Sequence, residues 1–171
     1  MTGVQTCALP IYRPETLGTS RPVAGSTRKG NHPVLFLVGD STMRNGTKGN
    51  GGNDQWGWGA FLEDWFDTDR ISVENQGYGG LSSRTFYHRL WNDVAAGIRP
   101  GDYVLIQLGH NDSGPLDSGR ARNSLPGTGK ESKDVTIVET VKKRRCSPMG
   151  SISAGWRRMS WTGADIPSFA R

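Results

Sequence analysis

Ser41 stands directly after an apolar run and a Gly-Asp pair in the stretch VLFLVGDSTMRNG, which covers residues 34–46. A buried strand that stops at a Gly-Asp turn leaves the following hydroxyl at the edge of a sheet. A hydroxyl placed there can attack a carbonyl if a base takes its proton and N–H groups stabilise the oxyanion that forms. Ser41 is therefore our candidate for the nucleophile of an acyl transfer.

Two later segments carry small polar residues of the kind that such a reaction uses. They read NQGYGGLSS over residues 75–83 and GHND over residues 109–112. We expect the backbone N–H groups of Ser41 and Gly80 and the side-chain amide of Asn111 to converge on the oxyanion. Glycine allows a close approach of the backbone, and an amide donates without the desolvation cost of a charge. Each motif alone is weak, since Gly-Asp-Ser is commonly a turn and an asparagine after a strand is commonly a loop cap.

Three predicted strands bring these segments together. They cover residues 34–38, 71–74 and 103–108, and the first and third are almost entirely apolar, as in strands covered on both faces of a parallel sheet. Ligands of such sheets bind at the carboxyl ends of the strands, which is where Ser41 and Asn111 stand.

Two predicted helices alternate with the strands. The segment WGWGAFLEDWF has an apolar face at helical spacing, which we expect to be part of the core. Residues 83–97 predict a second helix with four inward side chains. The alternation predicts right-handed crossovers and a doubly wound α/β fold. The first face consists of Trp58, Phe61, Leu62, Trp65 and Phe66, and the second of Phe86, Leu90, Val94 and Ala95.

The composition fits one soluble globular domain and favours neither a nucleic-acid nor a membrane partner. Hydrophobic residues make up 34% of the 171 residues. The longest apolar run, residues 34–38, is far shorter than the roughly 20 residues of a membrane helix. The net charge is +5, but seven basic residues and one acid lie beyond residue 141, so residues 1–141 carry a charge of −1. A basic surface for nucleic acid on the folded domain is therefore unsupported.

Both ends of the chain differ in character from the middle. Residues 1–12 begin with MTGVQTCALPI, which resembles the translation of a sequencing-library adapter more than a natural leader. Residues 13–32, rich in Pro, Gly, Ser, Thr and Arg, predict a flexible linker or lead-in. Residues 142–171 show no apolar periodicity, and we expect a disordered tail that results from a frameshift near residues 140–144. The alternative is a solvated basic tail.

No metal or cofactor is expected. Both cysteines, Cys7 and Cys146, lie in the two ends, and the loop aspartates have no metal-ligand spacing. The glycine-rich residues 46–54 lack the Lys-Ser/Thr ending of a phosphate-binding loop, so we interpret them as a mobile loop beside the nucleophile.

Three arginines are candidates for pairing with the carboxylates of an acidic sugar polymer such as pectin. Ordinary surface arginine is the safer alternative. They are Arg84, Arg120 and Arg122.

The Ser, Gly and Asn blocks follow one another as in the SGNH (GDSL-type) hydrolases, and the sequence resembles that superfamily over residues 33–140. GDSTM, GWG, NQGYGGLSSRTF, PGDYVLIQLGHND and LPGTGKES resemble its rhamnogalacturonan acetylesterase group. The resemblance implies a three-layer α/β/α sandwich with a parallel, flavodoxin-like sheet, of which residues 33–141 form the N-terminal part. It also implies a cofactor-free serine esterase that deacetylates pectic polysaccharide. The location implied is extracellular or periplasmic, although no signal peptide is visible.

Carried over residue by residue, the resemblance makes Ser41 the nucleophile and lets Gly80 and Asn111 complete the oxyanion hole. Asp40 is expected to stabilise the turn after the first strand, and His110 to pack or hydrogen-bond beside Asn111.

The resemblance implies that the general base is a histidine in a later D-x-x-H block near the C-terminus, in which the aspartate orients the imidazole. None of the three histidines, His32, His88 and His110, has an aspartate three residues earlier. We therefore expect little or no esterase activity from this chain as printed.

Two rival interpretations stay open. In the first interpretation, the chain is a non-catalytic carbohydrate-binding or interaction module. In the second, the incomplete sheet prevents the chain from folding stably. The oligomeric state is not predicted.

Overall fold

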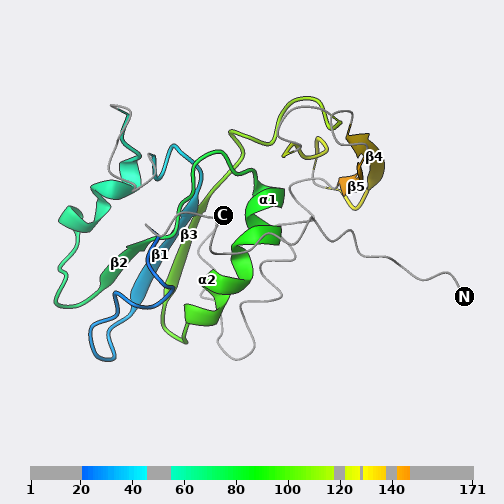
Figure 1. The fold of residues 1–171 in the computed structure, drawn as a ribbon. Helices are drawn as coiled ribbons and strands as arrows, with labels where there is room; N and C mark the ends of the chain where they lie inside the picture. The colour runs from blue at the N-terminus through cyan, green and yellow to red at the C-terminus, as the bar shows by residue number, and fades with distance from the viewer. Residues whose placement is uncertain (1–20, 46–54, 118–121, 128, 138–141, 147–171) are drawn as a thin grey trace, which may run out of the picture.

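The parallel sheet is built from two apolar strands, β1 (Val34–Gly39) and β3 (Tyr103–Gln107), and one mostly polar strand, β2 (Ser72–Asn75). The strands lie in the order β2-β1-β3 (Figure 1). This is the beginning of the flavodoxin-like strand order. The predicted α/β class is thus confirmed. The structure, a computed structural model, describes residues 21–45, 55–117, 122–127, 129–137 and 142–146.

The central strand β1 is buried along its whole length, whereas β3 is not. Phe36 of β1 lies opposite Glu74 of β2 and Val104 of β3. Strand β3 forms one edge of the described sheet, so part of its apolar surface faces solvent. The exposed apolar side chains of β3 are Tyr103, Leu105 and Ile106.

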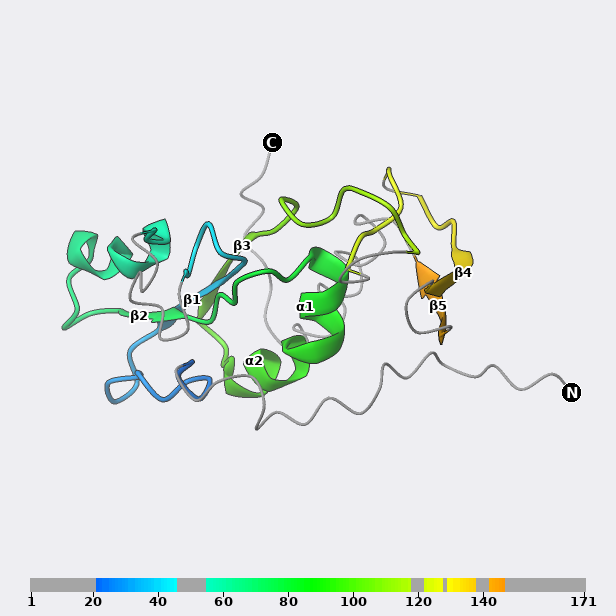
Figure 2. The ribbon, with the colours of Figure 1, turned by 45° about the horizontal axis from the view of Figure 1, so that its top comes forward.

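Two short helices cover one face of the sheet (Figures 1 and 2). Helix α1 (Ser83–Arg89) begins with a capping box, in which Ser82 and Thr85 each accept a hydrogen bond from the other's backbone N–H. Helix α2 (Trp91–Gly97) follows after one residue, Leu90, whose φ of −123° interrupts the helical conformation. The sequence had predicted one continuous helix over residues 83–97.

The core of this layer confirms the predicted inward positions and adds one. Phe86, Leu90 and Val94 are buried, and Ala95 is partly buried against them. Trp91, which the sequence analysis did not place, is 1% exposed and is the largest fully buried side chain.

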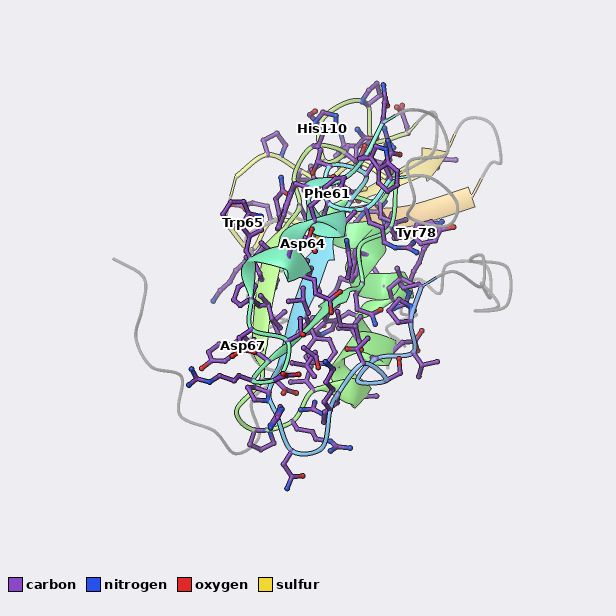
Figure 3. All side chains as sticks on the ribbon, turned by 90° about the vertical axis from the view of Figure 1, so that its left-hand side faces the viewer. Phe61, Asp64, Trp65, Asp67, Tyr78 and His110 are labelled. Atoms are coloured by element: carbon purple, nitrogen blue, oxygen red, sulfur yellow. The ribbon has the colours of Figure 1, made fainter. Side chains whose placement is uncertain are left out.

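On the other face of the sheet, the predicted helix with a buried aromatic face is wrong. The segment forms two 3-10 turns, η2 (Trp58–Ala60) and η3 (Leu62–Trp65), and only Leu62 of the predicted face packs against the core. The reason lies in the backbone, since Gly57 and Gly59 are buried directly against Met43 and prevent a regular helix from resting on the sheet. Figure 3 shows Phe61 and Trp65 on the outside of this segment. The exposed aromatic residues of the segment are Trp56, Trp58, Phe61, Trp65 and Phe66.

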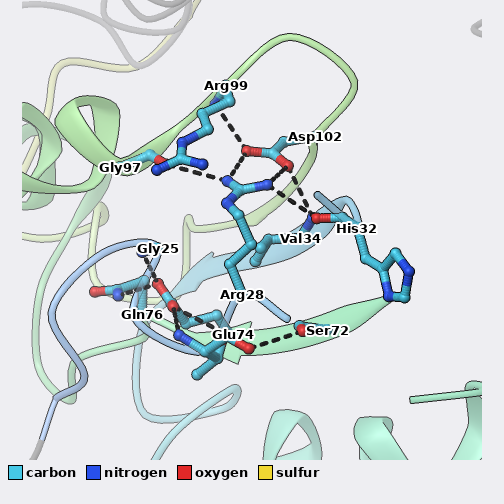
Figure 4. Close-up of polar contacts among 11 residues, drawn as sticks. Gly25, Arg28, His32, Val34, Ser72, Glu74, Gln76, Gly97, Arg99 and Asp102 are labelled. Carbon is cyan, nitrogen blue, oxygen red and sulfur yellow. Dashed lines mark hydrogen bonds and ion pairs between the residues drawn. The ribbon is translucent and has the colours of Figure 1, made fainter. Parts of the chain in front are cut away.

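Residues 21–32, the described part of the flexible linker predicted over residues 13–32, are held against the sheet, so the prediction is wrong for this part. The carboxylate of Glu74 in β2 is fully buried and accepts hydrogen bonds from the N–H groups of Gly25 (2.9 Å) and Thr27 (3.1 Å) and from the Thr27 hydroxyl (2.9 Å) (Figure 4). The Gln76 amide also donates to Glu74 (2.7 Å) and to the carbonyl of Pro22 (2.9 Å). Polar side chains on the sheet therefore hold this segment by its backbone.

A second attachment of the same segment is the ion pair of Arg28 with Asp102. Two guanidinium nitrogens donate to the two carboxylate oxygens at 2.7 and 2.5 Å, and the Asp102 side chain is 0% exposed (Figure 4). Asp102 also accepts from the N–H groups of Val34 (2.8 Å) and Arg99 (2.7 Å). Burial alone would raise the pKa of Asp102, but these hydrogen bonds outweigh burial and hold the pKa below its usual value.

A separate two-stranded antiparallel sheet pairs β4 (Lys133–Ile137) with β5 (Lys142–Cys146). Strand β5 lies in the segment predicted as a disordered tail, so that prediction is wrong for residues 142–146. The remainder of the predicted tail and the adapter-like residues 1–12 lie outside the described residues. In the part of the chain that the structure describes, no helix is long and apolar enough to span a membrane.

Candidate active site

The segments after the three strands meet at the carboxyl edge of the parallel sheet. The N–H of Tyr78, after β2, donates to the carbonyl of Gly39 at the end of β1 (2.9 Å). A Cβ built on Gly79 would lie 3.6 Å from the Cβ of Ser41, in ordinary van der Waals contact. The predicted nucleophile and the glycine pair of the second segment are therefore neighbours.

Asp40 shapes the turn that carries Ser41. Its side chain is buried, and one carboxylate oxygen accepts from the N–H (2.9 Å) and the hydroxyl (2.8 Å) of Thr42. Its backbone carbonyl accepts from the N–H groups of Met43 (3.1 Å) and Arg44 (3.0 Å). Asp40 thus fixes the turn locally, whereas Ser41 itself is only partly buried.

The turn is also fixed from the side of the aromatic segment. The N–H of Trp58 donates to the carbonyl of Thr42 and that of Gly59 to the carbonyl of Met43, both at 3.0 Å. A Cβ on Gly57 would lie 2.3 Å from the carbonyl carbon of Met43, so only glycine fits there. The GWG motif therefore acts as a backbone support for the nucleophile turn.

Gly80 has φ of +80°, a conformation that favours glycine. Its carbonyl accepts from a guanidinium nitrogen of Arg122 (3.0 Å), and the hydroxyl of Ser82 donates to the carbonyl of Arg122. The segment around residue 122 thereby holds the turn that contains the predicted oxyanion donor.

Asn111 is buried, and its amide donates to the carbonyl of Leu81 at 2.9 Å. This bond joins the segment after β3 to the segment after β2. An amide NH₂ has two hydrogens, so the bond to Leu81 leaves one for an oxyanion. The adjacent His110 is exposed, so it is not packed in the core beside Asn111; the alternative expectation, a hydrogen bond beside Asn111, stays a prediction (Figure 3).

Asp112 is a supporting residue that the sequence analysis missed. Its carboxylate accepts from the N–H of Ser83 (3.0 Å), from the hydroxyl of Ser83, and from the hydroxyl of Ser124 (2.5 Å). Its position directly after Asn111 was the available signal in the sequence. Among the described residues, no group of three or more His, Cys, Asp or Glu side chains could hold a metal ion.

The candidate sugar-binding arginines lie in different environments. Arg84 is buried and donates to the carbonyl of Asn123, so its role is structural. Arg122 is partly exposed beside Gly80. Arg120 lies outside the described residues.

The arrangement can do part of an acyl transfer. A partly exposed serine stands on a fixed turn next to a glycine with positive φ, and a buried amide lies on the same sheet edge. The other two histidines, His32 and His88, are exposed like His110, and His88 lies on α1 as the sequence analysis expected. None of the three histidines has the preceding aspartate of a D-x-x-H block, so the expected base-bearing block is not among these residues.

A parallel α/β fold with Ser, Gly and Asn segments at successive strand ends defines a protein of the SGNH class. The chain belongs to the GDSL-like Lipase/Acylhydrolase family, whose model matches residues 35–136. The resemblance given by the sequence motifs is thus confirmed.

Relatives with assigned names support the narrower group. The chain is 33% identical over 112 residues to a rhamnogalacturonan acetylesterase of Emericella nidulans, an alignment that covers 63% of this chain and 41% of that protein. It is 30% identical over 131 residues to the rhamnogalacturonan acetylesterase RhgT of Bacillus subtilis, covering 75% of this chain and 52% of RhgT. The chain thus spans about half or less of the length of these relatives.

A solved structure is also similar over part of the chain. The crystal structure of protein YxiM from Bacillus subtilis is 33% identical, with a TM-score of 0.44, over 49% of this chain and 24% of that one.

Proposed function

We propose that this chain is the nucleophile-bearing part of a serine esterase that removes acetyl groups from pectic polysaccharide, namely rhamnogalacturonan. The observation that carries the proposal is the contact of the Ser41 turn with the Gly79–Gly80 turn, combined with membership in the GDSL-like family. The substrate follows from the names of two relatives, both rhamnogalacturonan acetylesterases. A polymeric substrate of this kind suggests an extracellular or periplasmic location.

In the proposed reaction, the Ser41 hydroxyl attacks the acetyl carbonyl while a base removes its proton. The N–H groups of Ser41 and Gly80 and the amide of Asn111 stabilise the oxyanion. The oxyanion collapses, the sugar hydroxyl leaves with a proton from the base, and water then hydrolyses the acetyl-serine to release acetate. Asp40 acts on this reaction only through the turn that it fixes.

The base is the part that these residues do not supply. A D-x-x-H block is absent from the 171 residues, so we expect the chain alone to turn over an aryl acetate very slowly. Imidazole added to the solution replaces a histidine base in chemical terms, and it should accelerate hydrolysis by the chain if Ser41 is correctly placed.

The test is to measure hydrolysis of an aryl acetate over a series of imidazole concentrations for the chain and for Ser41→Ala. The rate measured with Ser41→Ala gives the hydrolysis by imidazole itself, which is subtracted from the rate measured with the chain. We expect an imidazole-dependent excess rate for the chain only, together with an acetyl adduct on the peptide that contains Ser41. Equal rates for both proteins, without an adduct, would refute the nucleophile assignment.

A second candidate function is carbohydrate binding without turnover. The exposed aromatic side chains of residues 56–66 favour it, because aromatic rings bind the apolar faces of sugars. This function predicts saccharide binding that is unchanged by Ser41→Ala, and no acetyl adduct at any imidazole concentration.

A further inference from the structure

Arg122 occupies a position beside the candidate site that the proposed reaction does not use. Its side chain is partly exposed, and one guanidinium nitrogen donates to the Gly80 carbonyl at 3.0 Å. The Gly80 N–H, the proposed oxyanion donor, belongs to the same residue as that carbonyl. The guanidinium therefore lies within one residue of the place where the acetyl oxygen would bind.

The segment that carries Arg122 is held in place by its neighbours rather than by Arg122 alone. The Arg122 carbonyl accepts from Ser82, and the Asn123 carbonyl accepts from the buried Arg84. The Ser124 N–H donates to the Asp112 carbonyl at 2.8 Å. The guanidinium is thus presented from a fixed backbone, which reduces the entropy that a bound ligand would have to remove.

The charge of Arg122 is available to a ligand. Within the described ranges, the structure records no ion pair for it, and the neighbouring Asp112 carboxylate is already bonded to Ser83 and Ser124. A guanidinium has five N–H donors in a planar fork, and the bond to Gly80 uses one of them. The remaining donors match the two oxygens of a carboxylate.

We propose that Arg122 is a specificity-determining residue, which binds the carboxylate of a uronic acid in the polysaccharide while it holds the Gly80 turn. The inference rests on the proposed function, because it places the acetylated sugar at Ser41. A uronic acid carries its carboxylate on the same ring as its hydroxyls, so the carboxylate that Arg122 binds would belong to the acetylated sugar at Ser41 or to a sugar next to it in the polymer.

The test measures binding, so it does not depend on turnover. Calorimetric titration of the chain with an acetylated rhamnogalacturonan oligosaccharide is compared with titration by the same oligosaccharide after methyl esterification of its carboxylates. The variants are Arg122→Gln, which removes the charge, and Arg122→Lys, which keeps the charge without the fork. Arg70→Gln is the matched control, because it removes one charge from an exposed arginine in the loop before β2.

We expect Arg122→Gln to weaken binding of the acidic oligosaccharide about tenfold, the order of magnitude for one charge-assisted hydrogen bond. Binding of the methyl-esterified oligosaccharide should change much less. Arg122→Lys should give an intermediate affinity that still decreases with salt, and Arg70→Gln should bind like the unmodified chain. Sodium acetate alone should not compete, which would separate the uronate from the acetate product.

Three results would overturn the inference: no binding of the acidic oligosaccharide, an equal loss for the acidic and the esterified oligosaccharides, or an equal effect of Arg70→Gln. An equal loss would mean that Arg122 acts only by holding Gly80. The proposed function fails separately, through the absence of an acetyl adduct on Ser41, because the adduct experiment uses a small aryl ester that has no carboxylate.

Discussion

Replacing Asp102 with alanine is expected to destabilise the protein by about 3 kcal/mol, the lower end of the range for removing one partner of a buried ion pair. The Asp102 side chain is 0% exposed and accepts four hydrogen bonds, from two nitrogens of Arg28 and from the N–H groups of Val34 and Arg99. Without Asp102, the guanidinium of Arg28, which is 7% exposed, keeps only its bonds to the carbonyls of His32 (3.1 Å) and Gly97 (3.3 Å). Those two bonds explain why we expect the lower end.

The assay is urea unfolding followed by far-UV circular dichroism, with Asp69→Ala as the control. Asp69 forms an exposed ion pair with Lys29 at 3.9 Å, and such pairs contribute little. The double variant of Arg28→Ala and Asp102→Ala should be hardly less stable than Asp102→Ala alone, since most of the penalty comes from the unpaired charge. Similar midpoints for Asp102→Ala and Asp69→Ala, or additive losses in the double variant, would refute this reasoning.

Three further predictions follow from the same packing. The pKa of Asp102 is lower in the folded protein than in the unfolded chain, so ionised Asp102 stabilises the fold above the unfolded carboxyl pKa of about 4, and this stabilisation is lost as the pH falls through the lower folded value. Urea midpoints over an acid pH series should show the loss, and Asp102→Asn should abolish this pH dependence. Gly57→Ala should displace the nucleophile turn, because the new Cβ would meet the carbonyl carbon of Met43 at 2.3 Å; a lower thermal midpoint and lost acetylation in imidazole would show it, and a protein unchanged in both would contradict it. Trp91→Ala should cost about 3–5 kcal/mol, whereas Trp65→Ala, at a side chain 84% exposed, should leave the unfolding curve unchanged.

Strands β1 and β3 were predictable because each is a short apolar run, although the expectation that both faces of the third strand are covered is wrong for β3, which is largely exposed in the described structure. The predicted strand 34–38 differs from β1 by one residue, and the predicted strand 103–108 also differs from β3 by one residue. Apolar content and length are enough for such elements. The position of the candidate residues followed from the strands, since the ends of parallel strands share one edge.

The wrong predictions share a cause, which is that composition and spacing do not include distant partners. Residues 21–33 have the composition of a loop, yet Glu74 binds the backbone of this segment and Asp102 binds the side chain of Arg28, so the segment is fixed. The aromatic residues between β1 and β2 have helical spacing, but the close packing of Gly57 on Met43 determines the backbone instead. Neither contact is visible in a window of neighbouring residues.

The role of Arg122 was visible only as one of several arginines. Its bond to Gly80 joins residues that are far apart in sequence, and the hydrogen bonds of Ser82 and Arg84 that place it are equally non-local. The sequence shows that residue 122 is an arginine, but only the three-dimensional arrangement shows that its guanidinium lies beside Gly80.

The exposed edge strand β3 is a place where a further strand could extend the sheet and the candidate site. Tyr103 is 60% exposed and Ile106 44% exposed, so within the described sheet the strand offers both unpaired backbone groups and an apolar surface to another strand. A strand added in parallel on that side would bring its own carboxyl end next to Asn111. Pairing of such a strand with β3 would extend the sheet and, in the same step, place a new side chain at the edge that carries Ser41. The site could therefore be assembled from two separate chain segments that pair at β3.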